Sequence, residues 1–164
     1  MNKISIIIPT YNRASLIKRS LDSVVNQNSV FEVIVVDDCG KDNTKSIVES
    51  YKEKLNIIYI RQSKNGGVNT ARNTAIRNAS GDWLVFLDDD DELVPNAINI
   101  ISEKICKLPN NISVMYFNSI IDNGVSLKSG GFQFYEGEKE YDPTYEDTMN
   151  KFRLKGDCKP VFRK

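Results

Sequence analysis

The stretch Trp83-Leu84-Val85-Phe86-Leu87-Asp88-Asp89-Asp90-Asp91 decides the fold, because a short apolar run ends there in four consecutive carboxylates. An apolar run of this length, rich in aromatic and branched side chains, predicts a buried strand. Four acids repel one another unless positive charge lies among them, and the pattern predicts a divalent cation in that role, since hard cations prefer carboxylate oxygens. The stretch therefore predicts a metal-assisted site at the carboxyl edge of a sheet.

Strand and helix patterns alternate on both sides of this stretch. The expected strands are residues 4–9, 32–37, 57–61, 83–87 and 113–118, and the expected helices are residues 14–26, 42–54, 67–79 and 95–107. Asp42 or Asn43 is expected to cap the second helix, and Pro95 to lie in the first turn of the fourth. This order predicts an α/β domain with a mostly parallel central sheet and helices on both faces.

The pattern weakens after residue 118. Thr144 is expected to cap a short helix through Phe152, and residues 160–163 have the composition of another strand.

Ligands of parallel sheets bind beyond the carboxyl ends of the strands. That rule brings together four polar loops, namely residues 10–13, 37–41, 62–67 and 88–92. The agreement between the topology and the unusual loops is stronger than the signal of any one loop.

The composition excludes several classes of function. The chain has 164 residues and a formal net charge of zero, so no general attraction to nucleic acid or anionic lipid is expected. It contains no histidine, which removes Ser-His-Asp and Cys-His catalysis. Cys39, Cys106 and Cys158 form no CxxC pair and are expected to be reduced thiols, and no segment has the length of a membrane span. We therefore expect a cytoplasmic protein, with attachment to the inner face of a membrane through regions outside this chain left open.

The acidic cluster has the spacing of a DxD motif at Asp88 and Asp90. One acid can bind the cation directly, while the other holds a sugar hydroxyl or a metal-bound water. The alternative is an acidic loop that stabilises the positive end of the helix after Pro95.

Three other segments contain candidate ligand-binding residues. Asp37 and Asp38 can accept a hydrogen bond from the imide N–H of uracil or from an amide of another base, or can cap the following helix. Arg72 can donate to a base or a phosphate, or can form a surface salt bridge. Tyr11 can stack on a base or belong to an ordinary turn, and Gly67 allows a ligand to approach the backbone closely.

Together these residues resemble the inverting glycosyltransferases of family 2, which have the GT-A fold. The resemblance covers residues 4–118 in order, and its motifs are Pro9-Thr10-Tyr11-Asn12, Val36-Asp37-Asp38, Asn65-Gly66-Gly67 through Arg72-Asn73, and Phe86 through Asp91 with Pro95. Two positions depart from the family pattern, Cys39-Gly40 and Asn73-Thr74-Ala75, and they leave the base specificity open.

The resemblance implies a role for each matching residue. Thr10, Tyr11 and Arg72 would lie against the base, and Asp38, with Asp37 beside it, would bind a uracil-like edge. Asp88 and Asp89 would lie near the ribose and a metal-bound water. Asp90, with Asp88, would hold Mn²⁺ or Mg²⁺, and Gly67 would belong to the substrate-binding loop.

The catalytic base of this family is a carboxylate from the C-terminal half of the fold. Residues 156–164 resemble the strand that precedes it, and the chain ends at Lys164. Glu146-Asp147 comes too early, so Asp147 is a minor candidate and the base is expected beyond Lys164. We therefore expect residues 1–118 to form the donor-binding domain and residues 119–164 to form an incomplete acceptor-side region.

The implied activity is transfer of a sugar, with inversion, from a nucleotide-diphosphate donor to a hydroxyl acceptor. A UDP-sugar donor is expected, with a saccharide or lipid-linked saccharide acceptor, in the synthesis of cell-surface polysaccharide. Two alternatives remain, a non-catalytic nucleotide-sugar-binding fragment and a sugar nucleotidyltransferase. The second is expected to carry a basic, glycine-rich loop after its first strand, where this chain has residues 9–13.

Overall fold

The computed structural model describes residues 2–28, 32–109, 112, 114–118, 121–122, 127–128, 133–134 and 158–164. Its helices are α1 (Ala14–Val25), α2 (Thr44–Glu49), α3 (Val68–Asn78) and α4 (Ala97–Cys106). Its strands are β1 (Ile4–Thr10), β2 (Glu32–Asp37), β3 (Ile57–Arg61), β4 (Trp83–Phe86), β5 (Val114–Asn118), β6 (Ile121–Asp122), β7 (Leu127–Lys128), β8 (Gln133–Phe134) and β9 (Cys158–Arg163).

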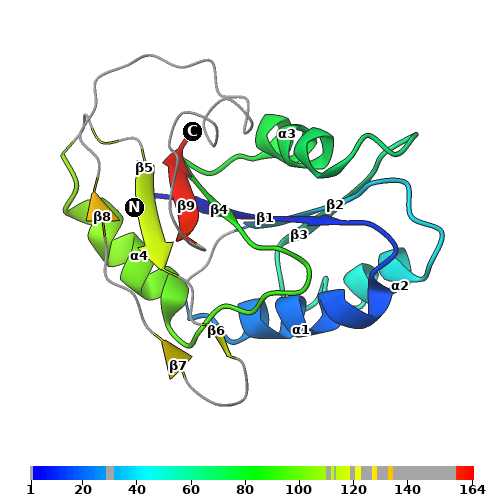
Figure 1. Cartoon of the computed structure of the whole chain (residues 1–164), viewed down its shortest axis with the longest axis horizontal. Helices are drawn as coiled ribbons and strands as arrows, with labels where there is room; N and C mark the ends of the chain where they lie inside the picture. Colours follow the sequence, from blue (N-terminus) through cyan, green and yellow to red (C-terminus); the bar gives the residue numbers. More distant parts are fainter. Residues whose placement is uncertain are drawn as a thin grey trace.

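The main sheet has the strand order β3-β2-β1-β4-β9-β5-β8 (Figure 1). β1 pairs in parallel with both β2 and β4, and β2 pairs in parallel with β3. β9 is antiparallel to both β4 and β5, so β1 to β5 all run in one direction. The predicted α/β architecture with a mostly parallel sheet is confirmed.

Two apolar cores form because successive side chains of a strand point to opposite faces. Ile6 and Ile8 of β1 face α1, α2 and α4, whereas Ile7 faces α3. The second core is built from small residues of α3, including Ala71 and Ala75, which let this helix lie close against the sheet. Figure 1 shows α1 and α2 on the side of the sheet opposite α3. The predicted helices on both faces are therefore present.

β9 joins the two halves of the sheet. Its Val161 belongs to the core that includes α1, α2 and α4, and its Phe162 meets Phe86 of β4 edge to face, with ring centroids 5.5 Å apart. Arg163 lies over the Trp83 ring, 5.0 Å from its centroid. A strand from residues 158–163 thus lies within the sheet formed by residues 4–118, and the predicted division of the chain at residue 118 stays a prediction.

The boundaries of two helices differ from the sequence prediction. α2 ends at Glu49 and gives way to turns, so the predicted extension to Lys54 is wrong. α4 begins at Ala97, because Asn96 at its N-cap has a left-handed backbone with φ of 62°, and Pro95 therefore lies outside the first turn. The helix predicted behind Thr144 lies outside the described residues. Across the described part of the chain, no helix is both long and apolar enough to cross a membrane.

Candidate functional site

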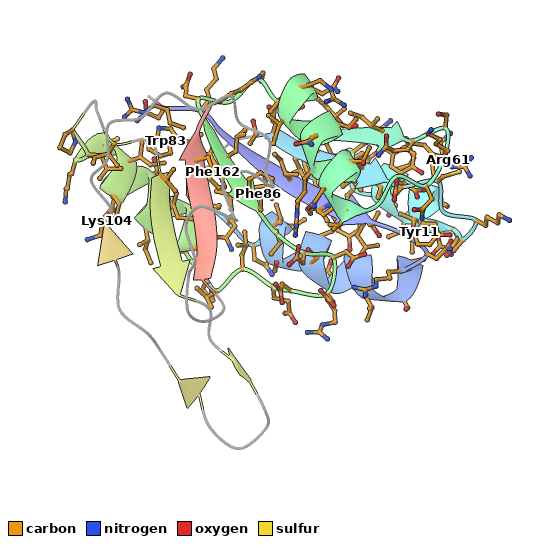
Figure 2. The ribbon with its side chains drawn as sticks, turned by 45° about the horizontal axis from the view of Figure 1, so that its top comes forward. Tyr11, Arg61, Trp83, Phe86, Lys104 and Phe162 are labelled. Carbon is orange, nitrogen blue, oxygen red and sulfur yellow. The ribbon has the colours of Figure 1, made fainter. Side chains whose placement is uncertain are left out.

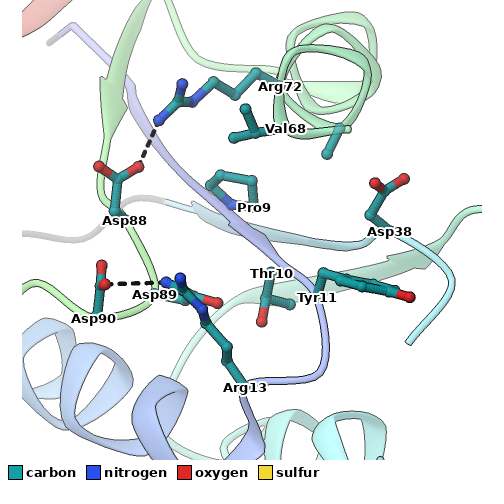
Figure 3. A pocket seen from close by; sticks show the side chains of 11 residues that line it. Pro9, Thr10, Tyr11, Arg13, Asp38, Val68, Arg72, Asp88, Asp89 and Asp90 are labelled. Atoms are coloured by element: carbon teal, nitrogen blue, oxygen red, sulfur yellow. Dashed lines mark hydrogen bonds and ion pairs between the residues drawn. The ribbon is translucent and has the colours of Figure 1, made fainter. Parts of the chain in front are cut away.

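A pocket of about 450 Å³ opens at the carboxyl ends of β1 and β4. Its size is within the range of small-ligand sites. Figure 3 shows Asp88 and Asp90 on one side, Asp38 on the other, and Pro9, Thr10 and Tyr11 between them. The lining residues are Pro9, Thr10, Tyr11, Arg13, Asp38, Val68, Ala71, Arg72, Asp88, Asp89 and Asp90.

The strand order explains this position. β1 lies between β2 and β4, so the chain leaves the sheet in different directions from neighbouring strands and a crevice opens between the connections. In Figure 2, Tyr11 and Arg61 lie at this end of the sheet, and Trp83, the first residue of β4, lies at the other end. Three of the four polar loops expected at one edge line the pocket. The fourth, residues 62–67, is joined to them through hydrogen bonds to Asp38.

Arg13 lies between two of the acids. Its Nη1 atom is 3.0 Å from Asp89 Oδ1 and 3.0 Å from Asp90 Oδ2. Burial raises the pKa of Asp89, whose side chain is 6% exposed, although the nearby Thr10 hydroxyl and the Arg13 guanidinium favour the charged form. Asp90 is about half exposed and turned toward the pocket.

Arg72 holds the first acid of the cluster. Its Nη2 atom is 2.5 Å from Asp88 Oδ1, and its side chain is only 12% exposed (Figure 3). The positive charges among the acids are thus two guanidinium groups, Arg13 and Arg72. These two charges offset part of the charge of the four acids, and a divalent cation at the cluster stays a prediction.

Asp38 joins two of the loops. Its buried carboxylate accepts hydrogen bonds from the backbone N–H of Gly66 at 2.9 Å and of Gly67 at 2.7 Å. Gln62 Nε2 donates to the same group at 3.3 Å. Gly67 has φ of 82° and ψ of 166°, a region almost restricted to glycine, and it starts α3. Asp38 therefore fixes the position of α3 as well as lining the pocket.

Asp37 lies outside the lining of the pocket. Its carboxylate accepts hydrogen bonds from the Gly40 N–H at 2.7 Å and from the Tyr59 hydroxyl at 2.5 Å, and burial together with Asp37 raises the pKa of Tyr59. These contacts fix the turn after β2. Gly67 also lies outside the lining and contributes through its N–H. A substrate contact by either residue stays a prediction.

A neighbouring acid, Asp42, caps two helices. Its carboxylate accepts hydrogen bonds from the Thr44 N–H at the start of α2, at 3.1 Å, and from the Ala14 N–H at the start of α1, at 2.8 Å. Asn43 is the N-cap residue of α2 and makes no side-chain cap hydrogen bond, while Asp42 before it accepts from the first N–H of both helices.

The centre of the pocket combines one polar atom with apolar surface. The Thr10 hydroxyl is buried and lies close to Asp89, but among the described residues it has no partner at regular hydrogen-bond geometry. Tyr11 and Val68 are 45% and 49% exposed and both line the pocket. An aromatic ring, an aliphatic side chain and an unsatisfied hydroxyl suit a ligand with a flat apolar face and polar edges.

Sequence reasoning missed Arg13, Val68 and Ala71. Arg13 could have been found, because it ends the loop after β1 that was expected at the same edge as the acids. Val68 and Ala71 share a face of α3 with Arg72 at helical spacing, so the helix prediction together with Arg72 contained that signal. Asp147, the minor candidate for the base, lies outside the described residues.

The acids offer a suitable donor set for a hard cation. Within the described ranges, no three acid or cysteine side chains converge on one point. Magnesium in nucleotide sites is, however, commonly held by one or two carboxylates together with substrate phosphates. Asp88 and Asp90 both line the pocket and could serve as such a pair.

The chain matches a known family over most of its length. The family model described as glycosyl transferase family 2 matches residues 5–163. A relative from Campylobacter jejuni, GalNAc(5)-diNAcBac-PP-undecaprenol beta-1,3-glucosyltransferase, is 37% identical over 107 residues, which are 63% of this chain and 35% of the relative. Poly(ribitol-phosphate) beta-N-acetylglucosaminyltransferase TarS from Staphylococcus aureus is 42% identical over 95 residues, which are 56% of this chain and 17% of TarS.

Solved structures agree with this match. The crystal structure of S. aureus TarS 1–349 in complex with UDP-GlcNAc superimposes with a TM-score of 0.70 and 34% identity, covering 77% of this chain and 37% of that one. Mannosyltransferase PcManGT from Pyrobaculum calidifontis, in complex with GDP-Man and Mn²⁺, has a TM-score of 0.62 and 29% identity, covering 69% and 34%.

The chain spans about a third of the length of the C. jejuni relative and about a sixth of TarS. On the match over residues 5–163 and the shared architecture, this chain belongs to glycosyl transferase family 2 and has the GT-A fold.

Proposed function

We propose that the pocket binds the nucleotide-diphosphate sugar donor of a glycosyltransferase, with UDP as the nucleotide. The observation that carries this proposal is the pocket itself, whose lining includes Tyr11 and Asp38 at one side and Asp88 to Asp90 at the other. A nucleotide sugar needs an aromatic or polar surface for its base and a charged surface for its diphosphate. The complexes of TarS with UDP and with UDP-GlcNAc support the choice of UDP.

The base lies against Tyr11 and Val68 in this proposal. Both side chains are about half exposed, so a base can cover them without displacing core residues. Asp38 keeps acceptor capacity beyond its bonds to Gly66 and Gly67, because a carboxylate has about four lone-pair sites. An imide N–H is a donor that this capacity suits. Arg72, held against Asp88, lines the same wall.

Asp90, with Asp88, holds a divalent cation at the other end of the pocket. The cation would neutralise charge on the diphosphate as it leaves the sugar. Support comes from the oxygen donors of the two acids and from the half-exposed position of Asp90. The PcManGT complex contains Mn²⁺ beside its nucleotide sugar, which makes Mn²⁺ or Mg²⁺ the cation to test.

Transfer then proceeds by displacement at the anomeric carbon, with inversion. The residues described here hold the donor and orient its diphosphate, and the acceptor hydroxyl loses its proton to a carboxylate base as it attacks. We place that base outside the described residues, either at Asp147 or beyond Lys164. The acceptor is a saccharide or lipid-linked saccharide, in keeping with the undecaprenol-linked glycan and the poly(ribitol phosphate) in the relatives' names. The setting is the synthesis of cell-surface polysaccharide at the cytoplasmic side of a membrane.

Family membership favours sugar transfer over nucleotidyl transfer. A role in binding alone, without catalysis, uses the same pocket and predicts the same donor affinity. The two differ in turnover, so a transfer or donor-hydrolysis assay on the chain separates them once binding is established.

The test is calorimetric titration of UDP with Mn²⁺ and then with EDTA. We expect UDP to bind at least about tenfold more weakly in EDTA, and Asp90→Asn to cause a similar loss in Mn²⁺, because a carboxylate ligand is removed. Asp91→Asn is the matched control, since it neutralises the next acid of the loop, which does not line the pocket. UDP affinity that is unchanged both by EDTA and by Asp90→Asn would contradict the assignment of a metal to the site. No binding of UDP under any condition would remove the donor site.

A further inference from the structure

One nitrogen of Arg13 bridges two carboxylates. Nη1 lies 3.0 Å from an oxygen of Asp89 and 3.0 Å from an oxygen of Asp90, so it occupies the space between these two acids. Figure 3 shows this side chain reaching into the acidic end of the pocket from the loop after β1. Arg13 therefore places a positive charge directly on an oxygen of Asp90, one of the two acids that would hold the divalent cation.

The exposed side chain of Arg13 has room to move, whereas Asp89, one of its two partner acids, is buried. The side chain of Arg13 is 50% exposed and that of Asp90 is 49% exposed, whereas that of Asp89 is 6% exposed. An ion pair between half-exposed groups is weak, so breaking the contact with Asp90 has a small cost. Arg13 stays charged at any pH that the protein tolerates, so it gives up Asp90 only by moving.

We propose that Arg13 is a built-in competitor of the divalent cation at Asp90. This inference rests on the proposed function, because it concerns the same metal site. The guanidinium is bonded to Oδ2 of Asp90, so a cation that takes this oxygen must displace it, and its positive charge also repels a cation on the other oxygen. Arg13 therefore lowers the affinity of the site for metal in the absence of nucleotide. It thereby raises the metal concentration that is needed to fill the site.

The experiment measures Mn²⁺ binding to the protein without nucleotide, by electron paramagnetic resonance of the free ion. The variants are Arg13→Gln and Arg13→Met, which remove the charge, Arg13→Lys, which keeps it, and Arg19→Gln. Arg19 is the matched control, because it is an exposed arginine of the same segment that pairs with Glu92 in the same acidic loop, with side chains 61% and 50% exposed. The control separates a lost competitor from a general loss of positive charge near the site.

We expect Arg13→Gln and Arg13→Met to bind Mn²⁺ about fivefold or more tightly than the wild type. Arg13→Lys and Arg19→Gln should stay within about twofold of wild type. Mn²⁺ affinity that is unchanged or weaker in both charge-removing variants, while Asp90→Asn still abolishes binding, would overturn the competitor and leave the metal site standing. If no variant binds Mn²⁺, with or without UDP, the metal part of the proposed function fails and the competitor fails with it. A melting curve by circular dichroism confirms that each variant is folded.

Discussion

The Asp38 carboxylate at the end of β2 accepts a 2.7 Å hydrogen bond from the backbone N–H of Gly67, 29 residues further along the chain. This contact fixes the first residue before α3, and α3 carries Val68 and Arg72 into the pocket. Asp38, predicted to bind ligand, and Gly67, predicted to let a ligand approach the backbone, are thus bonded to each other. The geometry of the pocket depends on it.

Gly67→Ala tests this connection through the backbone alone. A Cβ at this position would meet nothing within 4 Å, so any cost comes from the left-handed φ of 82° and not from a clash. We expect the free energy of unfolding to fall by about 1–3 kcal/mol, measured by urea denaturation, and UDP affinity to fall because the start of α3 shifts. Wild-type stability together with wild-type UDP affinity would show that the loop adapts and that the connection does not position the helix.

Tyr59→Phe tests the structural role of Asp37. The variant removes the hydroxyl that donates to Asp37 Oδ2 and leaves a buried carboxylate with one fewer partner. We expect the free energy of unfolding to fall by about 1–3 kcal/mol, with UDP affinity within about twofold of wild type, because Asp37 does not line the pocket. A large loss of UDP affinity in a stable variant would indicate that Asp37 contributes to UDP binding.

Arg72→Gln tests the basic wall of the pocket. The substitution removes the charge that holds Asp88 at 2.5 Å, so we expect UDP to bind about tenfold more weakly, both with Mn²⁺ and with EDTA. Arg77→Gln is the control, because Arg77 lies on the same helix, is exposed and does not line the pocket. Equal UDP affinities for the two variants by calorimetry would exclude Arg72 from the site.

Glu32→Gln tests the opposite end of the sheet and predicts a pH dependence. Burial alone would raise the pKa of Glu32, but hydrogen bonds from Ser5, Ser80 and Gly81 together lower it. A carboxyl whose pKa is lowered on folding stabilises the protein above its unfolded pKa, about 4.3 for glutamate, and loses that contribution as pH falls through the folded value.

We therefore expect Glu32→Gln to be about 1–3 kcal/mol less stable than wild type at pH 7. The gap between the two proteins should close as the pH is lowered from about 5 toward 3, measured by thermal unfolding at each pH. A gap that is constant with pH would mean that the charge of Glu32 makes no contribution. UDP affinity should be unaffected at pH 7, because Glu32 lies at the amino end of β2, away from the pocket.

The parts of the fold that could be predicted follow from local pattern. Fully buried strands such as β1 and β2 are mostly apolar, and the helices between strands have apolar side chains at helical spacing. The position of β9 between β4 and β5 could not be predicted, because strand order depends on long-range pairing and not on composition. The sequence pattern would allow both α2 and α4 to be longer. Turns end α2 after Glu49, and the left-handed backbone of Asn96 delays the start of α4 to Ala97.

The candidate site was predictable where chemistry follows strand ends, as at Asp38 and Asp88. The side-chain partners of those acids could not be predicted, because pairing across 76 residues, as between Arg13 and Asp89, leaves no local signal. The sequence therefore predicts a cation among the acids and gives no sign that two arginines supply part of the positive charge. Asp37 and Asp38 are the same residue type, but Asp37, the last residue of β2, bonds to Tyr59, whereas Asp38, the next residue, lines the pocket.

The most direct test of the central claim is where UDP binds on this chain. Backbone amide chemical shifts would be recorded by nuclear magnetic resonance during titration with UDP and the diamagnetic ion Mg²⁺. We predict shifts concentrated in residues 10–13, 38–41, 62–72 and 88–91, with Ser5, Glu32 and Gly81 at the other end of the sheet unchanged. Shifts that spare the pocket and cluster elsewhere, or no shifts at saturating UDP, would contradict the account.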